Sequence, residues 1–218
     1  MFRSVILAAG YGTRMSPLTD ENPKPLLPEV KNSMLLNQIT FLRKYKTDIT
    51  VTIGYQKQKM LEALKEYNVT NYIYSENKGN AFWINKVKIE KKEGPFVVIT
   101  SDNLMDINLD NLIEEYYNKG EKSMIVSTNA VNAKGDKIKI DDNKNILGMK
   151  YETSSGIIAS GLQLLNLHDI KKINSNIDDF HDVWNMLVKE KRLILSDYQP
   201  TKWISVDTVE DLKKLLIK

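Results

Sequence analysis

The 218-residue sequence contains no cysteine, which excludes a disulfide framework, a cysteine metal site and a cysteine nucleophile. No apolar run approaches the ~18 residues that a membrane helix needs, so no membrane contact is expected. The chain passes from Met1-Phe2-Arg3 straight into an apolar stretch, without the features of a signal peptide. These absences predict a soluble cytoplasmic protein.

Neither sign of charge dominates the chain. Lysine and arginine total 31, aspartate and glutamate total 28, and the net charge is +3. The lysines are scattered among acids, so the chain lacks the basic patch of a nucleic-acid-binding protein and suits anionic small molecules better. No linker or internal repeat interrupts residues 1–218, which predicts a single domain.

Short apolar runs alternate with amphipathic stretches along the first half of the chain. The expected strands there cover residues 4–9, 49–53, 72–74 and 96–100, and the expected helices cover 34–45, 58–67 and 81–89. This alternation predicts an α/β fold with a mostly parallel sheet that is covered on both faces. Ligands of such sheets bind at the carboxyl ends of the strands.

The second half changes character, because its expected strands follow one another more closely. These strands cover 123–128, 137–140, 146–151, 156–165, 192–196 and 202–206, with helices at 109–118, 183–190 and 209–217. The polar residues 141–145 are typical of a hairpin loop. We expect Thr208 to cap the last helix, with Asp211 completing a capping box.

The strongest chemical signal lies in residues 4–28. Gly10 and Gly12 follow the first expected strand, where glycine lets backbone N–H groups approach a phosphate chain. Arg14 can hold phosphate in bidentate fashion, and Lys24, fixed between two prolines, adds a point charge. A Gly-x-Gly turn also fits dinucleotide binding, but the third glycine is missing, and a P-loop is excluded because no Gly-Lys-Ser/Thr follows. The residues therefore predict a loop that holds a polyphosphate.

The complete string, L-A-A-G-x-G-T-R-x-x-P-L-T followed by P-K-P-L-L-P, resembles the signature loop of nucleotidyltransferases. These enzymes join a nucleoside triphosphate to a phosphorylated small molecule, and they include sugar-1-phosphate nucleotidylyltransferases and CTP:phosphocholine cytidylyltransferases. The resemblance implies a three-layer α/β/α, Rossmann-like (GT-A-like) fold with a mostly parallel mixed sheet. It also implies a nucleotide-binding half over residues 1–108 and an acceptor-binding half over residues 109–218.

The same resemblance implies the chemistry. The acceptor phosphate would attack the α-phosphorus and release pyrophosphate, which gives an activated precursor for surface polysaccharide or a related glycoconjugate. Arg14 would hold the leaving pyrophosphate, and Lys24 would bridge the α-phosphate and the incoming phosphate. Relatives often form homo-oligomers. The implied nucleotide-binding residues are Leu7, Ala8, Ala9, Gly10, Gly12, Thr13, Arg14, Glu76, Gly79, Asn80, Ala81 and Ser101.

Asp102 is the first candidate metal ligand, because it comes directly after the buried strand expected at 96–100. A carboxylate that faces a triphosphate needs a metal between them, and Mg²⁺ suits this role. Ser101-Asp102-Asn103 also matches the metal-binding turn of the family, which implies that Asp102 binds Mg²⁺. The alternative is that Asp102 only caps the segment that follows.

Asp207 is the second candidate metal ligand. Residues 203–212 resemble the closing motif of the family, in which many sugar enzymes carry the ligand acid at the position of Ser205. The cytidylyltransferases that activate acidic sugars use the acid of a V-D-T string, which here is Asp207. Alternatively, Asp207 only begins the last helix, where the helix dipole favours a carboxylate.

Several departures from the sugar enzymes favour CTP and a phosphocholine-like acceptor. Asn80 stands where threonine is usual, Phe82 and Trp83 follow it, and residues 158–162 replace a sugar-binding string. These departures resemble the phosphocholine cytidylyltransferases. Aromatic side chains could cage a quaternary ammonium group, stack on a sugar or fill the core; the candidates are Trp83, Tyr151, Trp184 and Trp203. The expected acceptor-binding residues are Lys150, Gly161 and Trp184.

Three other functions stay open at this point. The first is a sugar-1-phosphate nucleotidylyltransferase that uses UTP, dTTP or GTP. The second is a GT-A glycosyltransferase, which shares the fold and an acidic metal motif but releases no pyrophosphate. The third is an inactive nucleotide-binding module, suggested by Ser205 in place of an acid.

Overall fold

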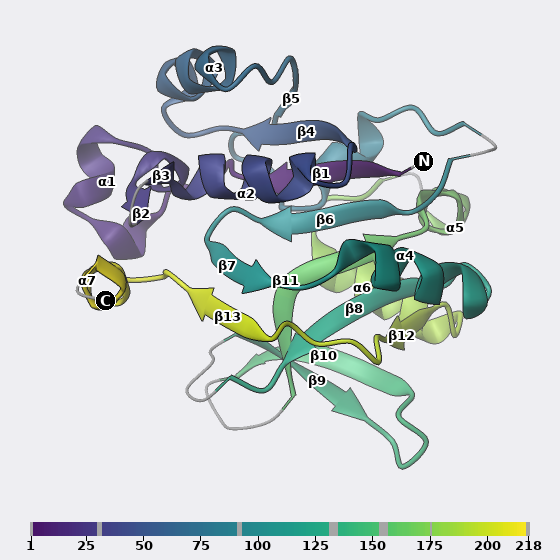
Figure 1. Cartoon of the computed structure of the whole chain (residues 1–218). Helices are drawn as coiled ribbons and strands as arrows, with labels where there is room; N and C mark the ends of the chain where they lie inside the picture. The colour runs from purple at the N-terminus through teal and green to yellow at the C-terminus, as the bar shows by residue number, and fades with distance from the viewer. Residues whose placement is uncertain are drawn as a thin grey trace.

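A mixed β-sheet forms the middle layer of the molecule (Figure 1). The computed structural model describes residues 2–29, 32–90, 93–130, 135–152, 157–174 and 176–216, and within them the sheet has nine strands. Its parallel part has the spatial order β6-β1-β4-β5. These strands are β1 (Arg3–Leu7), β4 (Asp48–Ile53), β5 (Asn71–Tyr74) and β6 (Phe96–Thr100).

The second half of the chain extends this sheet mainly with antiparallel strands. β11 is antiparallel to β6, β8 and β9, and β9 and β10 form the expected hairpin. β12 adds a short parallel pair with β8. The strands are β8 (Ser123–Thr128), β9 (Gly135–Ile140), β10 (Ile146–Glu152), β11 (Ile158–Leu165) and β12 (Leu193–Leu195).

Helices cover both faces of the sheet. One face carries α2 (Met34–Arg43), α3 (Lys57–Glu66) and α4 (Leu109–Asn118). The other carries α5 (Leu167–Ile173), α6 (Phe180–Lys189) and a short 3-10 helix, η3 (Phe82–Asn85). Among the described residues, no helix combines the length and apolarity that crossing a bilayer requires.

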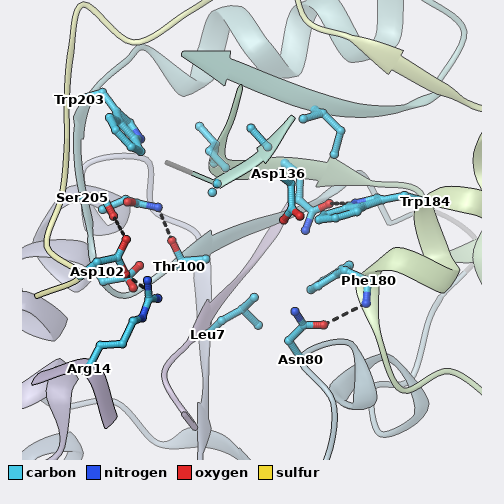
Figure 2. A pocket seen from close by; sticks show the side chains of 18 residues that line it. Leu7, Arg14, Asn80, Thr100, Asp102, Asp136, Phe180, Trp184, Trp203 and Ser205 are labelled. Atoms are coloured by element: carbon cyan, nitrogen blue, oxygen red, sulfur yellow. Dashed lines mark hydrogen bonds and ion pairs between the residues drawn. The ribbon is translucent and has the colours of Figure 1, made fainter. Parts of the chain in front are cut away.

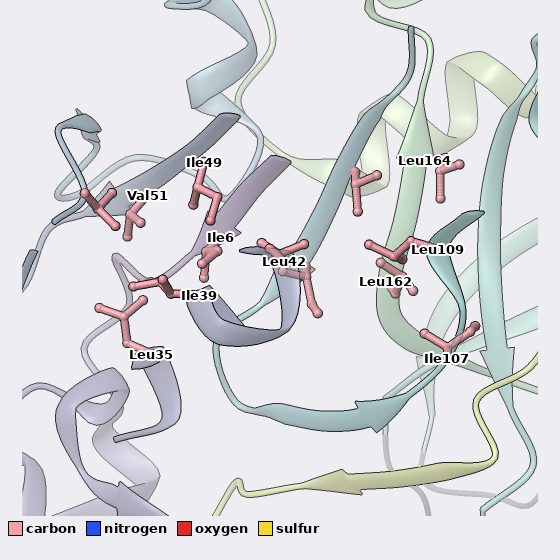
Figure 3. Packing of buried hydrophobic residues seen from close by; sticks show 14 of the residues in the cluster. Ile6, Leu35, Ile39, Leu42, Ile49, Val51, Ile107, Leu109, Leu162 and Leu164 are labelled. Carbon is pink, nitrogen blue, oxygen red and sulfur yellow. The ribbon is translucent and has the colours of Figure 1, made fainter. Parts of the chain in front are cut away.

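The core divides into two layers because successive side chains of a strand point to opposite faces. Ile6 on β1 packs beneath α2 against Ile39 and Leu42 (Figure 3). Its neighbour Val5 belongs to the cluster on the other face, which α6 covers. Each fully buried aliphatic side chain stabilises the fold by roughly 1.5–3 kcal/mol. The predicted three-layer α/β/α, Rossmann-like fold is confirmed.

A two-stranded ribbon lies beside the main sheet and joins distant parts of the chain. It pairs β7 (Asn103–Asp106) with β13 (Lys202–Ser205) in antiparallel fashion, and α7 (Val209–Leu216) follows it. Thr208 and Asp211 bond each other's backbone N–H groups, at 3.0 and 3.3 Å, so the predicted capping box is confirmed. The remaining short elements are η1 (Thr13–Met15), α1 (Leu18–Glu21), η2 (Lys24–Leu26), β2 (Pro28–Glu29) and β3 (Asn32–Ser33).

Two local predictions differ from the structure. The helix expected at 81–89 is only the single turn η3 (Phe82–Asn85), and the segment also bonds to residues 177–178. Ala81 N donates to Asp178 O at 2.9 Å, and the Asn85 amide donates to Ile177 O. Helix α5, in contrast, was not expected; Asn166 caps it by accepting from the N–H groups of residues 168 and 169. Residue 156, the first of the strand expected at 156–165, lies outside the described residues.

Candidate active site

The site lies at the carboxyl ends of β1 and β6. The two strands pair in parallel, with Leu7 opposite Thr100, and Ser101 N donates to Leu7 O at 3.1 Å. The loop after β1 and the turn after β6 therefore meet at one edge of the sheet, as expected of parallel neighbours. This edge is where open α/β sheets bind ligands.

Gly12 shapes the loop that carries the two cations. Its φ of +66° is a conformation that a side chain rarely adopts, and an added Cβ would lie 2.8 Å from Lys24 Cβ. Thr19 Oγ1 donates to Gly12 O at 3.1 Å, which fixes the turn from the other side. The absence of a side chain at position 12 therefore lets the Lys24 side chain pass the loop.

Lys24 stands between two carboxylates. Its Nζ lies 2.7 Å from Asp102 Oδ2 and 3.3 Å from Asp207 Oδ1. Arg14 Nη2 also reaches Asp207 Oδ1, at 2.9 Å. The Lys24 side chain is 11% exposed and the Arg14 side chain 60% exposed. Lys24 is thus fixed within the wall, whereas Arg14 can turn toward a ligand at little cost.

Ser205 has a definite place in this cluster. It ends β13, and its hydroxyl donates to Asp207 Oδ2 at 3.1 Å. The backbone of the same segment is held by Val206 N, which donates to Asp102 O at 3.0 Å. The residue that replaces an acid in the sequence motif therefore orients the neighbouring acid.

The two aspartates suit a divalent cation that arrives with a triphosphate. Both carboxylates reach one ammonium group, so both can face a single cation. Mg²⁺ is commonly held by one or two carboxylates, with phosphate and water oxygens completing its shell. Within the described ranges, no group of three or more acidic, histidine or cysteine side chains is placed to hold a metal. The donor set fits Mg²⁺ only as a shared ligand of protein and nucleotide.

One cleft runs past this cluster in three joined parts, all bordered by Leu7 and Asn80. The central compartment, about 430 Å³, is lined by the loop after β1, Lys24 and both aspartates. The β5-side compartment, about 190 Å³, lies toward Thr52, Asn77 and Gly79. The β11-side compartment, about 200 Å³, lies toward β9, β11 and α6 (Figure 2).

The turn at residues 79–81 borders the β5-side compartment. A Cβ at Gly79 would lie 2.1 Å from Asp178 O, and Gly79 N donates to Asp178 Oδ1 at 3.0 Å. Ala81 is fully buried. Asn80 Oδ1 accepts from Phe180 N at 2.9 Å, so the residue ties the turn to α6 while it borders the cleft. Gly79 and Ala81 allow close packing against residue 178 and the core, and Gly79 and Asn80 border the compartment.

Aromatic and polar side chains share the β11-side compartment (Figure 2). Phe180 and Trp184 stack on each other, with ring centroids 5.8 Å apart. Trp184 Nε1 donates to Gln163 Oε1 at 2.9 Å, which sets the direction of both side chains. Asp136 lines the same wall; burial raises the pKa of its carboxyl group, although the positive charge of His181 opposes this shift.

Gly161 leaves space for the side chains of Asn103 and Thr100. Its φ is +83°, and an added Cβ would lie 2.2 Å from Asn103 Nδ2 and 2.5 Å from Thr100 Oγ1. The same Asn103 amide donates to Thr100 Oγ1 at 2.6 Å and to Ser160 O at 3.0 Å. The glycine therefore makes room for the network that joins β6, β7 and β11 beneath the cleft.

The structure brings most of the predicted site residues together. Those that border the cleft are Leu7, Ala8, Ala9, Gly10, Gly12, Thr13, Arg14, Lys24, Gly79, Asn80, Ser101, Asp102, Gly161, Trp184 and Asp207. Glu76, Ala81 and Lys150 are not among the lining residues. Glu76 accepts from Tyr74, and Lys150 borders a separate hollow on the β9–β10 hairpin with Lys137 and Lys139.

The aromatic residues proposed to contact the acceptor lie in different places. Trp184 and Trp203 border the β11-side compartment, whereas Trp83 is 1% exposed and packs in the core near Phe96. The Tyr151 side chain lies outside the described residues. Phe180 also lines this compartment, as do Asp136 and Gln163, which were not singled out from the sequence. The alternation along 158–165 could have indicated Gln163; no local pattern marks Asp136.

The fold and the charged cluster define an enzyme class that handles nucleotides at the carboxyl edge of an α/β sheet. The family model described as nucleotidyl transferase matches residues 3–150. The chain belongs to this nucleotidyl transferase family.

Individual similarities agree with this assignment. "Mannose-1-phosphate guanyltransferase 2" of Candida glabrata is 28% identical over 225 aligned positions, which cover 96% of this chain and 62% of the relative. The chain thus spans about three fifths of the length of that relative. A putative glucose-1-phosphate thymidylyltransferase of Bacillus anthracis has a TM-score of 0.80 at 19% identity, covering 100% of this chain and 94% of the other. CTP:phosphocholine cytidylyltransferase of Streptococcus pneumoniae has a TM-score of 0.74 at 21% identity, covering 99% and 98%. Both of these solved structures share the fold of this chain.

Proposed function

We propose that the chain transfers a nucleoside monophosphate from a nucleoside triphosphate to the phosphate of a sugar 1-phosphate and releases pyrophosphate. The observation that carries this proposal is the position of Lys24. It lies between Asp102 and Asp207 at 2.7 and 3.3 Å, in the compartment that joins the two outer ones. A cation in this place can neutralise phosphate charge that comes from either side.

The triphosphate would lie in the central compartment against the loop after β1. Backbone N–H groups of that loop and the exposed guanidinium of Arg14 would hold the leaving pyrophosphate. Lys24 would hold the α-phosphate and the incoming phosphate close together, and such positioning lowers the barrier without a covalent intermediate. Asp102 and Asp207 would hold Mg²⁺, which neutralises negative charge on the phosphate chain.

The outer compartments would receive the base and the acceptor. The β5-side compartment presents backbone groups and the side chains of Asn77 and Asn80, which suit the edge of a base. The β11-side compartment combines the faces of Phe180 and Trp184 with the polar groups of Gln163 and Asp136. An apolar face beside hydrogen-bonding groups suits a sugar ring.

GTP with mannose 1-phosphate is the first pair to test, since two curated relatives that are 28% identical to this chain carry that activity in their names. The expectation of CTP and a phosphocholine-like acceptor is less well supported. Of the departures that suggested it, Trp83 lies in the core, and Asn80 bonds to Phe180 N. The product would be a nucleotide-linked sugar, the activated form consumed in polysaccharide or glycoconjugate synthesis.

The test is pyrophosphate release with Mg²⁺ across ATP, GTP, CTP, UTP and dTTP, each against several hexose 1-phosphates and phosphocholine. Release with one sugar 1-phosphate supports the proposal and identifies the base. Release with phosphocholine alone would show that the acceptor is phosphocholine rather than a sugar 1-phosphate, and CTP would then be the main candidate for the nucleotide. Nucleotide binding without release in any pair would indicate an inactive module, and sugar transfer from a nucleotide sugar would indicate a glycosyltransferase.

A further inference from the structure

Asp136 is a carboxylate in the cleft that the chemistry described so far does not use. It lies on β9 and lines the β11-side compartment. Its side chain is 25% exposed and its Oδ1 atom is buried, so Oδ2 is the oxygen open to the compartment. Among the described residues, none donates a hydrogen bond to Oδ1. Burial of a carboxylate is costly, and a ligand that donates a hydrogen bond to Oδ2 lowers that cost.

His181 holds this carboxylate from behind. Its Nε2 lies 3.3 Å from Asp136 Oδ1, and its ring packs edge-on against Trp184 with centroids 5.2 Å apart. The helix cap places it, because His181 N donates to Asp179 Oδ1 at 2.7 Å. The imidazole therefore faces the buried oxygen and leaves Oδ2 available.

The neighbouring groups select among ligand chemistries. His181 Nε2 already lies against Oδ1, so Oδ2 is the oxygen of Asp136 that is left for a ligand. Gln163 uses its Oε1 for Trp184, which leaves Nε2 as a donor. Asp136 Oδ2 supplies an acceptor on the same lining. One donor and one acceptor match a hydroxyl group, which can both donate and accept.

We propose that Asp136, positioned by His181, selects the acceptor by accepting a hydrogen bond from a ring hydroxyl of a sugar phosphate. This inference rests on the proposed function. Figure 2 shows Arg14 and Asp102 at one side of the compartment and Asp136 and Trp184 at the other. The hydroxyl therefore belongs to the part of the ring far from the phosphate, and the ring lies against Trp184.

The experiment measures pyrophosphate release by the full chain with a hexose 1-phosphate and with its monodeoxy analogues. Asp136→Asn should lower kcat/KM for the parent sugar about 10- to 100-fold, mainly through the acceptor KM, with the nucleotide KM unchanged. In the wild type, one monodeoxy analogue should lose a similar factor. The variant should lose little more with that analogue, because the two changes remove the same contact.

Two further variants separate positioning from general damage. Asp142→Asn makes the same chemical change in the exposed loop of the same hairpin, and it should leave all constants unchanged. His181→Gln should raise the acceptor KM about threefold to tenfold in the wild-type background, with little effect in the Asp136→Asn background. Thermal unfolding of each variant shows whether it folds.

The outcomes distinguish failure of the proposed role of Asp136 from failure of the proposed function. Turnover of a sugar 1-phosphate by the wild type, with Asp136→Asn equal to it, would overturn the role of Asp136 and leave the function standing. An equal loss on every analogue would also overturn it, since no hydroxyl would then couple to Asp136. Failure of the wild type to bind or use any sugar 1-phosphate would overturn both.

Discussion

The central and β11-side compartments share a wall but use the chain differently. The central compartment is built largely from one continuous stretch, residues 7–25, with short contributions from the ends of β6 and β13. The β11-side compartment draws a few residues each from β9, β11, α6 and β13, which are far apart in the sequence. Phosphate is the same in every nucleotide, so a fixed loop can hold it, whereas an acceptor pocket changes through separate residues on a constant scaffold.

The largest expected effect comes from Lys24, which lines the central compartment and is proposed to hold both reacting phosphates. Lys24→Ala should lower kcat/KM for nucleotide and acceptor alike by about 10³-fold, because the phosphates lose a buried cation at the point of reaction. Initial rates of pyrophosphate release measure this, with Lys65→Ala on the exposed face of α3 as the control. A variant impaired with only one of the two substrates would place Lys24 in a single compartment.

The next effect concerns the hydrogen bonds of Asn103, which join β6, β7 and β11 beneath the cleft. Gly161→Ala should lower the free energy of unfolding by about 2 kcal/mol, because the new Cβ meets the Asn103 amide at 2.2 Å and φ is +83°. For a chain of this size, the melting temperature would fall by roughly 4–8 °C. Gly148→Ala on β10 is the matched control, since its Cβ would meet nothing within 4 Å. Equal melting temperatures for the two variants would contradict the crowding at Gly161.

A smaller and one-sided effect is expected at the aromatic wall. Trp184→Phe keeps the stacking surface for Phe180 but removes the donor to Gln163 Oε1. The acceptor KM should rise about threefold to tenfold, while the nucleotide KM stays constant. Steady-state kinetics with each substrate varied in turn separates the two, and a matching rise in the nucleotide KM would refute the division of the cleft.

The smallest effect is expected on the metal side. Ser205→Ala removes the hydroxyl that donates to Asp207 Oδ2, so Asp207 would hold Mg²⁺ less firmly. The Mg²⁺ concentration for half-maximal activity should rise about twofold to fivefold, and Ser205→Asp should lower it. Titration of activity with Mg²⁺ at fixed nucleotide gives both values. If neither variant changed this Mg²⁺ concentration, Ser205 would have no role in metal binding.

The same contrast explains what the sequence could reveal. The bounds of β6, α4 and β8 agree with the prediction, because apolar periodicity alone determines them. The phosphate loop was also recognisable, since its glycines, cations and prolines lie in one stretch. Asp136 and Gln163 were not, because they come to one compartment through the pairing of β11 with β8 and β9 rather than through any local pattern. The helix expected at 81–89 failed for a related reason, as contacts with residues 177–178 outweigh its local propensity.

The β7–β13 ribbon has a consequence for the order in which the site forms. Arg14 and Asp207 are 193 positions apart, and Lys24 and Asp207 are 183 apart. A ribosome releases the phosphate loop well before β13, and contacts of such separation close late because the intervening chain must already be ordered. The cation–carboxylate cluster therefore forms only when both ends of the stretch from Arg14 to Asp207 are in place, so binding of a nucleotide reports on the folding of that stretch.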